Sequence, residues 1–355
     1  MHAVAARRRG FEVMQLEREA EARGASVRNF GLVWVSGRKA GPELALALRA
    51  RELWQELGAE APGLGFRAAG SLTLAADDAE LGLLKEAAAL PDAPERGFEL
   101  LDPGAVRAVN PALHGEFAGG LLCRLDAIVE PRQVLPALRG YLAGEAYQWL
   151  PGREVTEVVP DAVRDHTGTW HHGDLVVLCT GAAHTGVAGR YLARGGAVRR
   201  VRLQMMQTAP LAERITTALA DGDSLRYYPA YDLPGRGQLT PQSAAAARAR
   251  AQLLLVQRAD GALTIGDTHE YAEPFAFDVD EDAYEHLRAR AQTLLGVPIP
   301  RTQRRWAGVY SEVDPAVADH SLYHRSEVEP GVVLVTGPGG RGMTCSPAIA
   351  EETFR

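Results

Sequence analysis

The sequence predicts an α/β fold whose domains interleave along the chain, one of them a Rossmann-like nucleotide-binding domain that lacks its first strand. Three observations predict this fold. The chain opens with a helix, a glycine, a strand and an acid; helical and strand patterns then alternate without an internal repeat; and near the end a strand runs through a glycine-rich turn into a helix. The first and last features belong to one nucleotide-binding unit, so both ends of the chain are expected to meet in one domain.

The opening segment predicts the second half of a βαβ unit. Residues 1–9 are typical of the last turns of a helix, and Gly10 is the expected C-terminal stop. Residues 11–17 follow as a strand that ends in Glu17, a position from which an acid accepts hydrogen bonds from the adenosine ribose. The alternative for Glu17 is a solvated surface residue. The first half of the unit, which a parallel sheet normally places at its centre, is expected to be missing.

The remaining elements follow from hydrophobic periodicity and from proline and glycine positions. Pro42 lies near the first turn of a helix, and Glu130-Pro131-Arg132 opens another. A polar, proline-rich stretch at 232–243 is expected to be a surface loop. The predicted helices cover 41–60, 77–90, 130–143, 244–255 and a segment from Ser346, and the predicted strands cover 70–74, 153–159, 170–179, 253–257, 263–266 and 331–336.

Composition argues against several classes of function. The net charge of −7 disfavours nucleic acid or an anionic membrane as partner. Three cysteines without a Cys-x-x-Cys pair predict neither a disulfide framework nor a metal site. No apolar run approaches the roughly 18 residues that span a bilayer. A cytoplasmic protein is expected, with a transit peptide as the alternative for the basic residues 1–9.

Glycine-rich loops are the candidate ligand-binding segments. Residues 337–344 hold four glycines and a proline between a strand and a helix, so backbone N–H groups can approach an anionic or electron-rich ring closely. The alternative is a tight turn, which needs fewer glycines. Residues 179–181 follow an apolar strand, and residues 23–31 supply small residues soon after Glu17; an ordinary strand end and a capped loop are their alternatives.

Together these segments resemble the D-amino-acid-oxidase/glycine-oxidase (DAO) superfamily of FAD-dependent oxidoreductases, and within it a bacterial subfamily linked to phosphonate breakdown. The resemblance is carried, in chain order, by residues 24–31, 130–133, 203–205, 225–229, 263–267, 269–271 and 337–344. It implies a glutathione-reductase-type FAD-binding domain over 1–50, 131–205 and 325–355. It also implies an α+β substrate domain on a mixed or antiparallel sheet over 51–130 and 206–324. Aligning residues 3–10 with the first helix of the family puts its Gly-x-Gly-x-x-Gly loop upstream of Met1, which a late start site or a degenerate gene would explain.

The resemblance also implies the contacts to a non-covalent FAD. Glu17, with Arg18 beside it, would bind the ribose, and the backbone of Val155 would bind the adenine. Residues 26–29 would lie beside the pyrophosphate and flavin, and 339–344 along the flavin pyrimidine. The full expected set is Glu17, Arg18, Ser26, Val27, Arg28, Asn29, Val155, Thr180, Gly181, Gly337, Gly339, Gly340, Gly342, Met343 and Thr344.

Four side chains are candidates for positioning the substrate. Arg226 and Arg341 lie in the motifs of the resemblance, and a guanidinium group matches a carboxylate or phosphonate with two parallel hydrogen bonds. The alternative for each arginine is a surface ion pair. Tyr228 is expected to wall the pocket, and His269 to reach the flavin, although aromatic residues and a lone histidine are often structural. No acid–base residue is required, because the cofactor carries the chemistry.

The implied reaction is oxidation of a small primary or secondary amine to an imine or aldehyde. The subfamily resemblance implies 2-aminoethylphosphonate or its N-methyl derivative as substrate, and a glycine, sarcosine or D-amino acid is the alternative. The electron acceptor is oxygen or an unknown partner, because Thr264 stands where related sarcosine oxidases carry a lysine that promotes reaction with oxygen. A different class, an inactive remnant unable to hold FAD, is the remaining hypothesis.

Overall fold

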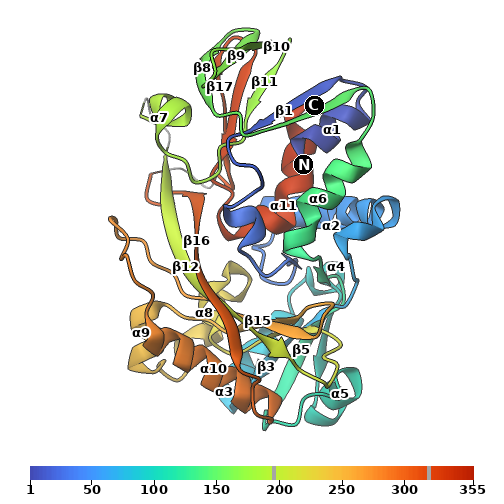
Figure 1. The fold of residues 1–355 in the computed structure, drawn as a ribbon. Coiled ribbons are helices and arrows are strands. Elements are labelled where there is room, and N and C mark those ends of the chain that lie inside the picture. The colour runs from blue at the N-terminus through green and yellow to red at the C-terminus, as the bar shows by residue number, and fades with distance from the viewer. Residues whose placement is uncertain (194–196, 318–320) are drawn as a thin grey trace.

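The computed structural model describes residues 1–193, 197–317 and 321–355. Two halves are joined by the long antiparallel strands β12 (Val198–Pro210) and β16 (Thr302–Val313), which run from one half into the other (Figure 1). The N- and C-termini lie side by side in the upper half, where His2 Nε2 is 3.0 Å from Thr353 Oγ1. The expectation that both ends of the chain meet in one part of the molecule is therefore confirmed.

The lower half is built on a mixed sheet of eight strands. Its order is β16-β12-β15-β14-β13-β3-β5-β4, and all neighbours are antiparallel except the parallel pair β13–β3. Besides β12 and β16, the strands of this sheet are β3 (Ser71–Ala75), β4 (Phe98–Leu101), β5 (Gly119–Cys123), β13 (Ala218–Ala220), β14 (Leu254–Gln257) and β15 (Ala262–Gly266). The predicted mixed or antiparallel sheet is confirmed.

Both faces of this sheet are buried, because successive side chains of a strand point to opposite faces. Leu255 and Met206 pack with helix α10 (Glu281–Leu295) on one face. Their chain neighbours Leu254 and Met205 pack on the other face, with helix α3 (Asp78–Ala88) and the aromatic side chains of the cavity described below. The central strands β13 and β14 are therefore mainly apolar along their length rather than alternating.

The upper half contains short sheets. β1 (Val13–Glu17) pairs in parallel with β7 (Tyr147–Pro151), and β11 (Val176–Leu178) pairs in parallel with β18 (Val332–Thr336). Within the described residues β1 has no strand partner besides β7, and β11 none besides β18. The parallel sheet is thus split into two parts. The other strands are β17 (His324–Glu329), β8 (Val155–Val159), β9 (Ala162–Asp165), β10 (Trp170–His172), β2 (Leu32–Val33) and β6 (Ala127–Ile128).

Helices cover both halves. α1 (His2–Arg8) ends before Gly10, which has a φ of +87°, as the sequence predicts. In the described residues, the other α-helices are α2 (Pro42–Glu60), α4 (Ala93–Arg96), α5 (Pro103–Val109), α6 (Pro131–Leu142), α7 (Gly186–Leu192), α8 (Ser224–Tyr227), α9 (Ala244–Ala249) and α11 (Gly342–Thr353). In the parts of the chain that are described, no helix is both long and apolar enough to cross a membrane.

Three sequence-based boundaries are wrong for local reasons. The helix expected over 244–255 ends at Ala249, because Arg250 is left-handed and the apolar residues after it enter β14. The strand expected over 170–179 is two strands, β10 and β11, separated by three residues with a bend at Asp174. The helix expected from Ser346 begins at Gly342, four residues earlier.

An ion pair joins α2 to α11 and predicts how stability depends on pH. Arg49 binds Glu351 through Nη2 at 2.7 Å and Nε at 3.1 Å, and these hydrogen bonds lower the pKa of Glu351 from 4.5 to about 2. A carboxyl group whose pKa falls on folding stabilises the protein above its unfolded pKa, and that stability is lost as pH drops through the folded pKa. We expect Glu351→Gln to lower the unfolding midpoint at pH 7. The loss should amount to at most about 1 kcal/mol, because Arg49 is partly exposed.

Thermal unfolding at a series of pH values tests this expectation. The difference between Glu351→Gln and the parent protein should shrink as pH falls from 4.5 toward 2. Glu52→Gln is the matched control, since Glu52 also binds Arg49, at 2.8 Å, but within α2 itself. A difference that stayed constant over this range would show that Glu351 stabilises the protein by packing rather than by its charge.

Candidate functional site

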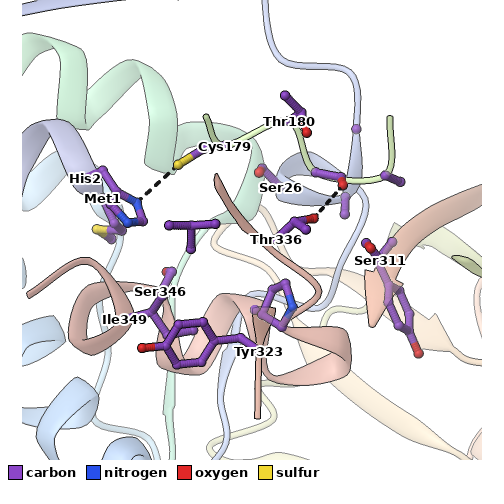
Figure 2. Close-up of a pocket in the computed structure, with 18 of the residues that line it drawn as sticks. Met1, His2, Ser26, Cys179, Thr180, Ser311, Tyr323, Thr336, Ser346 and Ile349 are labelled. Atoms are coloured by element: carbon purple, nitrogen blue, oxygen red, sulfur yellow. Dashed lines mark hydrogen bonds between the residues drawn. The ribbon is translucent and has the colours of Figure 1, made fainter. Parts of the chain in front are cut away.

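One cavity of about 2660 Å³ lies between the two halves. It is lined by β1, by the loop after it, by the end of β11 and by the glycine-rich turn before α11. Figure 2 shows side chains from these segments around it, among them Ser26, Thr180 and Ser346. Among the described residues, β1 and β11 each have one edge without a strand partner, and both strands line this cavity. Glu17 and the glycine-rich turn, far apart in sequence, therefore open onto a single cavity.

The expected adenosine side is formed by strand ends. Glu17 lines the cavity, and its Oε1 accepts a hydrogen bond from Glu19 N at 3.0 Å. Arg18 also lines the cavity but is exposed and lies 3.5 Å from Glu19. Val155 reaches the cavity from β8. The expected ribose and adenine contacts thus lie on one wall.

The end of β11 offers an unused polar atom. Thr180 Oγ1 is buried and has no hydrogen-bond partner in the described parts of the chain, although its residue lines the cavity. The neighbouring Gly181 O accepts a hydrogen bond from Thr336 Oγ1 at 2.9 Å, which ties this loop to β18 (Figure 2). A buried hydroxyl without a partner is costly, so a ligand group that bonds to Thr180 would stabilise the site.

The loop after β1 is held by its own residues. Asn29 donates to Ala25 O at 2.8 Å and accepts from Gly31 N at 2.7 Å, so its side chain shapes the loop. Arg28 lines the cavity, although its Nη1 donates to Ala307 O of β16 at 2.8 Å, and Ser26 lines it too. Val27 does not line the cavity. Asn29 lines the cavity as well as shaping the loop, so Val27 is the one member of residues 26–29 that lies outside the lining.

The glycine-rich turn contributes five of its six expected residues. Gly339, Gly340, Gly342, Met343 and Thr344 line the cavity, and Gly337 does not. Gly337 has a φ of +70°, and a Cβ there would lie 2.9 Å from Val198 Cγ1, so this glycine permits the turn to pack on β12. Thr344 Oγ1 accepts from Trp34 N at 2.9 Å and thereby joins the turn to the opposite wall.

The residues present fit a dinucleotide. The cavity exceeds the roughly 300–1,000 Å³ of a typical small-ligand pocket. A Cβ added at Gly24 or Gly181 would meet no atom within 4 Å, so the backbone there is open to a ligand. Thr180 supplies a free hydroxyl, and Glu17 supplies a carboxylate at the end of β1.

Aromatic side chains form the wall toward the eight-stranded sheet. Tyr228 is buried, with its ring 5.8 Å from Trp34 and 5.1 Å from Tyr227. Burial is the main cause of the raised pKa of Tyr228; the Asp267 carboxyl raises it further and the Arg38 guanidinium opposes this. His269 is also buried and stacks on Tyr227 at 4.2 Å. The structure brings Tyr228 and His269 to the same cavity as the glycine-rich turn.

The two expected anchor arginines differ in position. Arg226 does not line the cavity, and its guanidinium binds Thr240 O and lies 3.5 Å from Asp223. Arg226 therefore does not join Tyr228, His269 and Arg341 at the cavity, because Thr240 and Asp223 hold its guanidinium group elsewhere. Arg341 does line the cavity, and its Nε donates to Glu43 at 2.9 Å.

Sequence reasoning missed Arg38, which lies 6.0 Å above the Tyr228 ring. Arg38 is 4% exposed, donates to Trp34 O at 2.9 Å and lies 3.6 Å from Glu43. Two guanidinium groups, Arg38 and Arg341, thus share one carboxylate, which leaves positive charge at the cavity wall. The available signal was an arginine soon after the apolar run of residues 32–35 and shortly before Pro42.

Known proteins resemble this chain over its whole length in structure. Glycine oxidase from Geobacillus kaustophilus superimposes with a TM-score of 0.74 at 19% identity, covering 98% of this chain and 88% of that one. L-proline dehydrogenase from P. horikoshii gives 0.75 at 18% identity, covering 99% and 88%. These likenesses show the fold.

In sequence, the chain is 33% identical over 186 residues to a protein of Rhizobium etli named putative thiamine biosynthesis oxidoreductase ThiO. That alignment covers 50% of each protein, so the chain spans about half the length of the curated relative it matches. The family model described as FAD dependent oxidoreductase (DAO) matches residues 1–355. With its full length matched, the chain belongs to the DAO family of FAD-dependent oxidoreductases.

Proposed function

We propose that this chain binds FAD without a covalent link and oxidises a small primary or secondary amine that carries an anionic group. The observation that carries the proposal is the single cavity shared by Glu17, the glycine-rich turn, and the buried cluster of Tyr228 and His269. Glu17, Thr180 and residues 339–344 would hold the cofactor. Bound FAD supplies the hydride acceptor for the carbon next to the amine.

Glycine- or sarcosine-like amino acids are the first substrate class. The glycine oxidase likeness supports this choice, and the shared charge of Arg38 and Arg341 suits a carboxylate. The same two arginines also suit a phosphonate, so 2-aminoethylphosphonate and its N-methyl derivative form the second class. Tyr228 and Trp34 would hold the carbon skeleton and keep water from it.

Purified protein tests the proposal in two steps. A yellow preparation with flavin absorbance supports it, whereas colourless protein that takes up no added FAD would identify an inactive remnant. Anaerobic mixing with glycine, sarcosine, 2-aminoethylphosphonate and its N-methyl derivative then separates the substrate classes by the bleaching of the flavin. Reoxidation in air shows whether oxygen accepts the electrons. Bleaching by none of these amines would reject the proposed reaction.

Thr180 gives a direct test of the cofactor position. We expect Thr180→Val to weaken FAD retention about 3- to 10-fold, because the one buried hydroxyl available to the ligand at this loop is lost. Thr180→Ser keeps the hydroxyl and is the matched control. The measurement is the flavin-to-protein ratio after dialysis. Equal retention by all three proteins would place the cofactor away from this loop.

A further inference from the structure

A buried carboxyl group in the cavity has no role in the reaction described so far. Asp267 is 5% exposed and lines the cavity at the end of β15. Its Oδ1 accepts a hydrogen bond from Gln252 Nε2 at 3.1 Å. Its Oδ2 lies 3.9 Å from His269 Nε2, beyond hydrogen-bond reach. Asp267 therefore keeps an oxygen that none of these contacts satisfies.

Gln252 presents a second unused acceptor beside it. Gln252 is 2% exposed, its Nε2 faces the carboxyl group, and among the described residues its buried Oε1 has no hydrogen-bond partner. Backbone hydrogen bonds in both directions fix the two residues against each other: Gln252 N donates to Asp267 O at 3.0 Å, and Asp267 N donates to Gln252 O at 2.8 Å. Both side chains line the cavity.

The surroundings suit a cation. Burial raises the pKa of Asp267, because a carboxylate is less stable away from water, and a bound cation would favour its charged form. The Asp267 charge, in turn, adds to the burial that raises the pKa of Tyr227 and Tyr310, so these hydroxyls lie within its electrostatic reach. Aromatic rings around a carboxylate are a favourable setting for an ammonium group.

We propose that Asp267 and Gln252 form the subsite that binds the ammonium group of the substrate. The proposal rests on the proposed function and deepens it. Two acceptors match an amine that has at least two N–H groups in its protonated form, which selects primary and secondary amines over quaternary ones. Arg38, whose guanidinium group lies 6.0 Å from the centre of the Tyr228 ring, carries the opposite charge, so the cavity offers both charges to a zwitterion.

Two N–H groups of the ammonium donate hydrogen bonds, one to Asp267 Oδ2 and one to Gln252 Oε1, and no covalent bond is made or broken in this step. His269 holds the subsite in place: its Nδ1 lies 3.1 Å from Arg250 O, and its ring stacks on Tyr227. His269 is therefore a positioning residue. Asp267 distinguishes an ammonium group from a neutral group of the same shape.

Methoxyacetate, which replaces the ammonium of sarcosine with an ether oxygen, provides the test. Binding of both compounds is measured by calorimetry on holoprotein whose flavin has been reduced anaerobically, so the amine is not consumed. Propylphosphonate and 2-aminoethylphosphonate form the second pair. The parent protein should bind at least one amine about tenfold more tightly than its neutral partner. Asp267→Asn should abolish this preference while the neutral partner binds as before or better.

The possible outcomes distinguish failure of the proposed function from failure of the ammonium subsite. Colourless parent protein rejects the proposed function itself. Yellow parent protein without a preference for either amine rejects the ammonium subsite, even if Asp267→Asn fails to fold. If the Asp267→Asn protein is yellow but binds both members of a pair more weakly by the same factor, the ammonium subsite is also rejected, because Asp267 would then only support the fold. Loss of preference with unchanged flavin content supports the subsite.

Discussion

Gly31→Ala is expected to destabilise the protein by more than about 4 kcal/mol, beyond the usual range for one substitution. Gly31 has a φ of +67°, and a Cβ there would lie 2.1 Å from Val129 O and 2.8 Å from Pro131 Cδ. The clash is with backbone, and that backbone is fixed because Val129 N donates to Gly31 O at 2.7 Å. Residues 26–29 lie just before this contact, so bound flavin should be lost as well.

Gly152→Ala is the matched control, measured alongside Gly31→Ala by thermal and denaturant unfolding. Gly152 has nearly the same backbone conformation, with a φ of +69°, but a Cβ there would meet no atom within 4 Å. Its substitution should cost only the left-handed backbone penalty, roughly 1–2 kcal/mol. Similar losses at the two positions would show that the contact with Val129 yields easily, contrary to the expectation.

The fold was predictable where local patterns carry it. The opening helix, Gly10 and the strand ending at Glu17 follow from stop signals and periodicity, and so does the helix that begins at Pro42. The long strands β12 and β16 were not predicted. Their residues obey no simple alternation, because β12 contributes to both buried faces of the eight-stranded sheet, and only the partner strands decide which residues are covered.

The parts of the candidate site that could be predicted from the sequence are its glycine-containing segments. The turn at 339–344 and the loop at 180–181 line the cavity as expected. Arg226 was expected at the cavity and does not line it, because a motif does not give the direction of a side chain on a one-turn helix. Asp267 and Arg38 were missed because their importance depends on burial, which arises only when β15 and the segment before α2 close on the same aromatic cluster.

Gly37→Ala is expected to displace Tyr228 and to slow amine oxidation. A Cβ at Gly37 would lie 2.5 Å from Tyr228 Cδ1 and 2.8 Å from Trp34 Nε1. Tyr228 cannot retreat easily, because Tyr227 packs edge-on against it at 5.1 Å. Such overpacking costs about 1–3 kcal/mol, and the ring that moves is part of the cavity wall. Stability and the rate of flavin bleaching by the amine should fall together.

A double-mutant cycle with Tyr228→Leu isolates this contact. Leucine removes the ring atoms that the new Cβ would meet, so Gly37→Ala should cost less than about 0.5 kcal/mol in the Tyr228→Leu protein. An unchanged cost in that protein would mean that the strain arises at Trp34 instead. Because Tyr228 is near enough to Arg38 and Asp267 for both charges to act on its hydroxyl, its displacement should also weaken binding of the zwitterion more than binding of FAD. The flavin-to-protein ratio of Gly37→Ala should therefore stay near that of the parent while its half-saturating amine concentration rises.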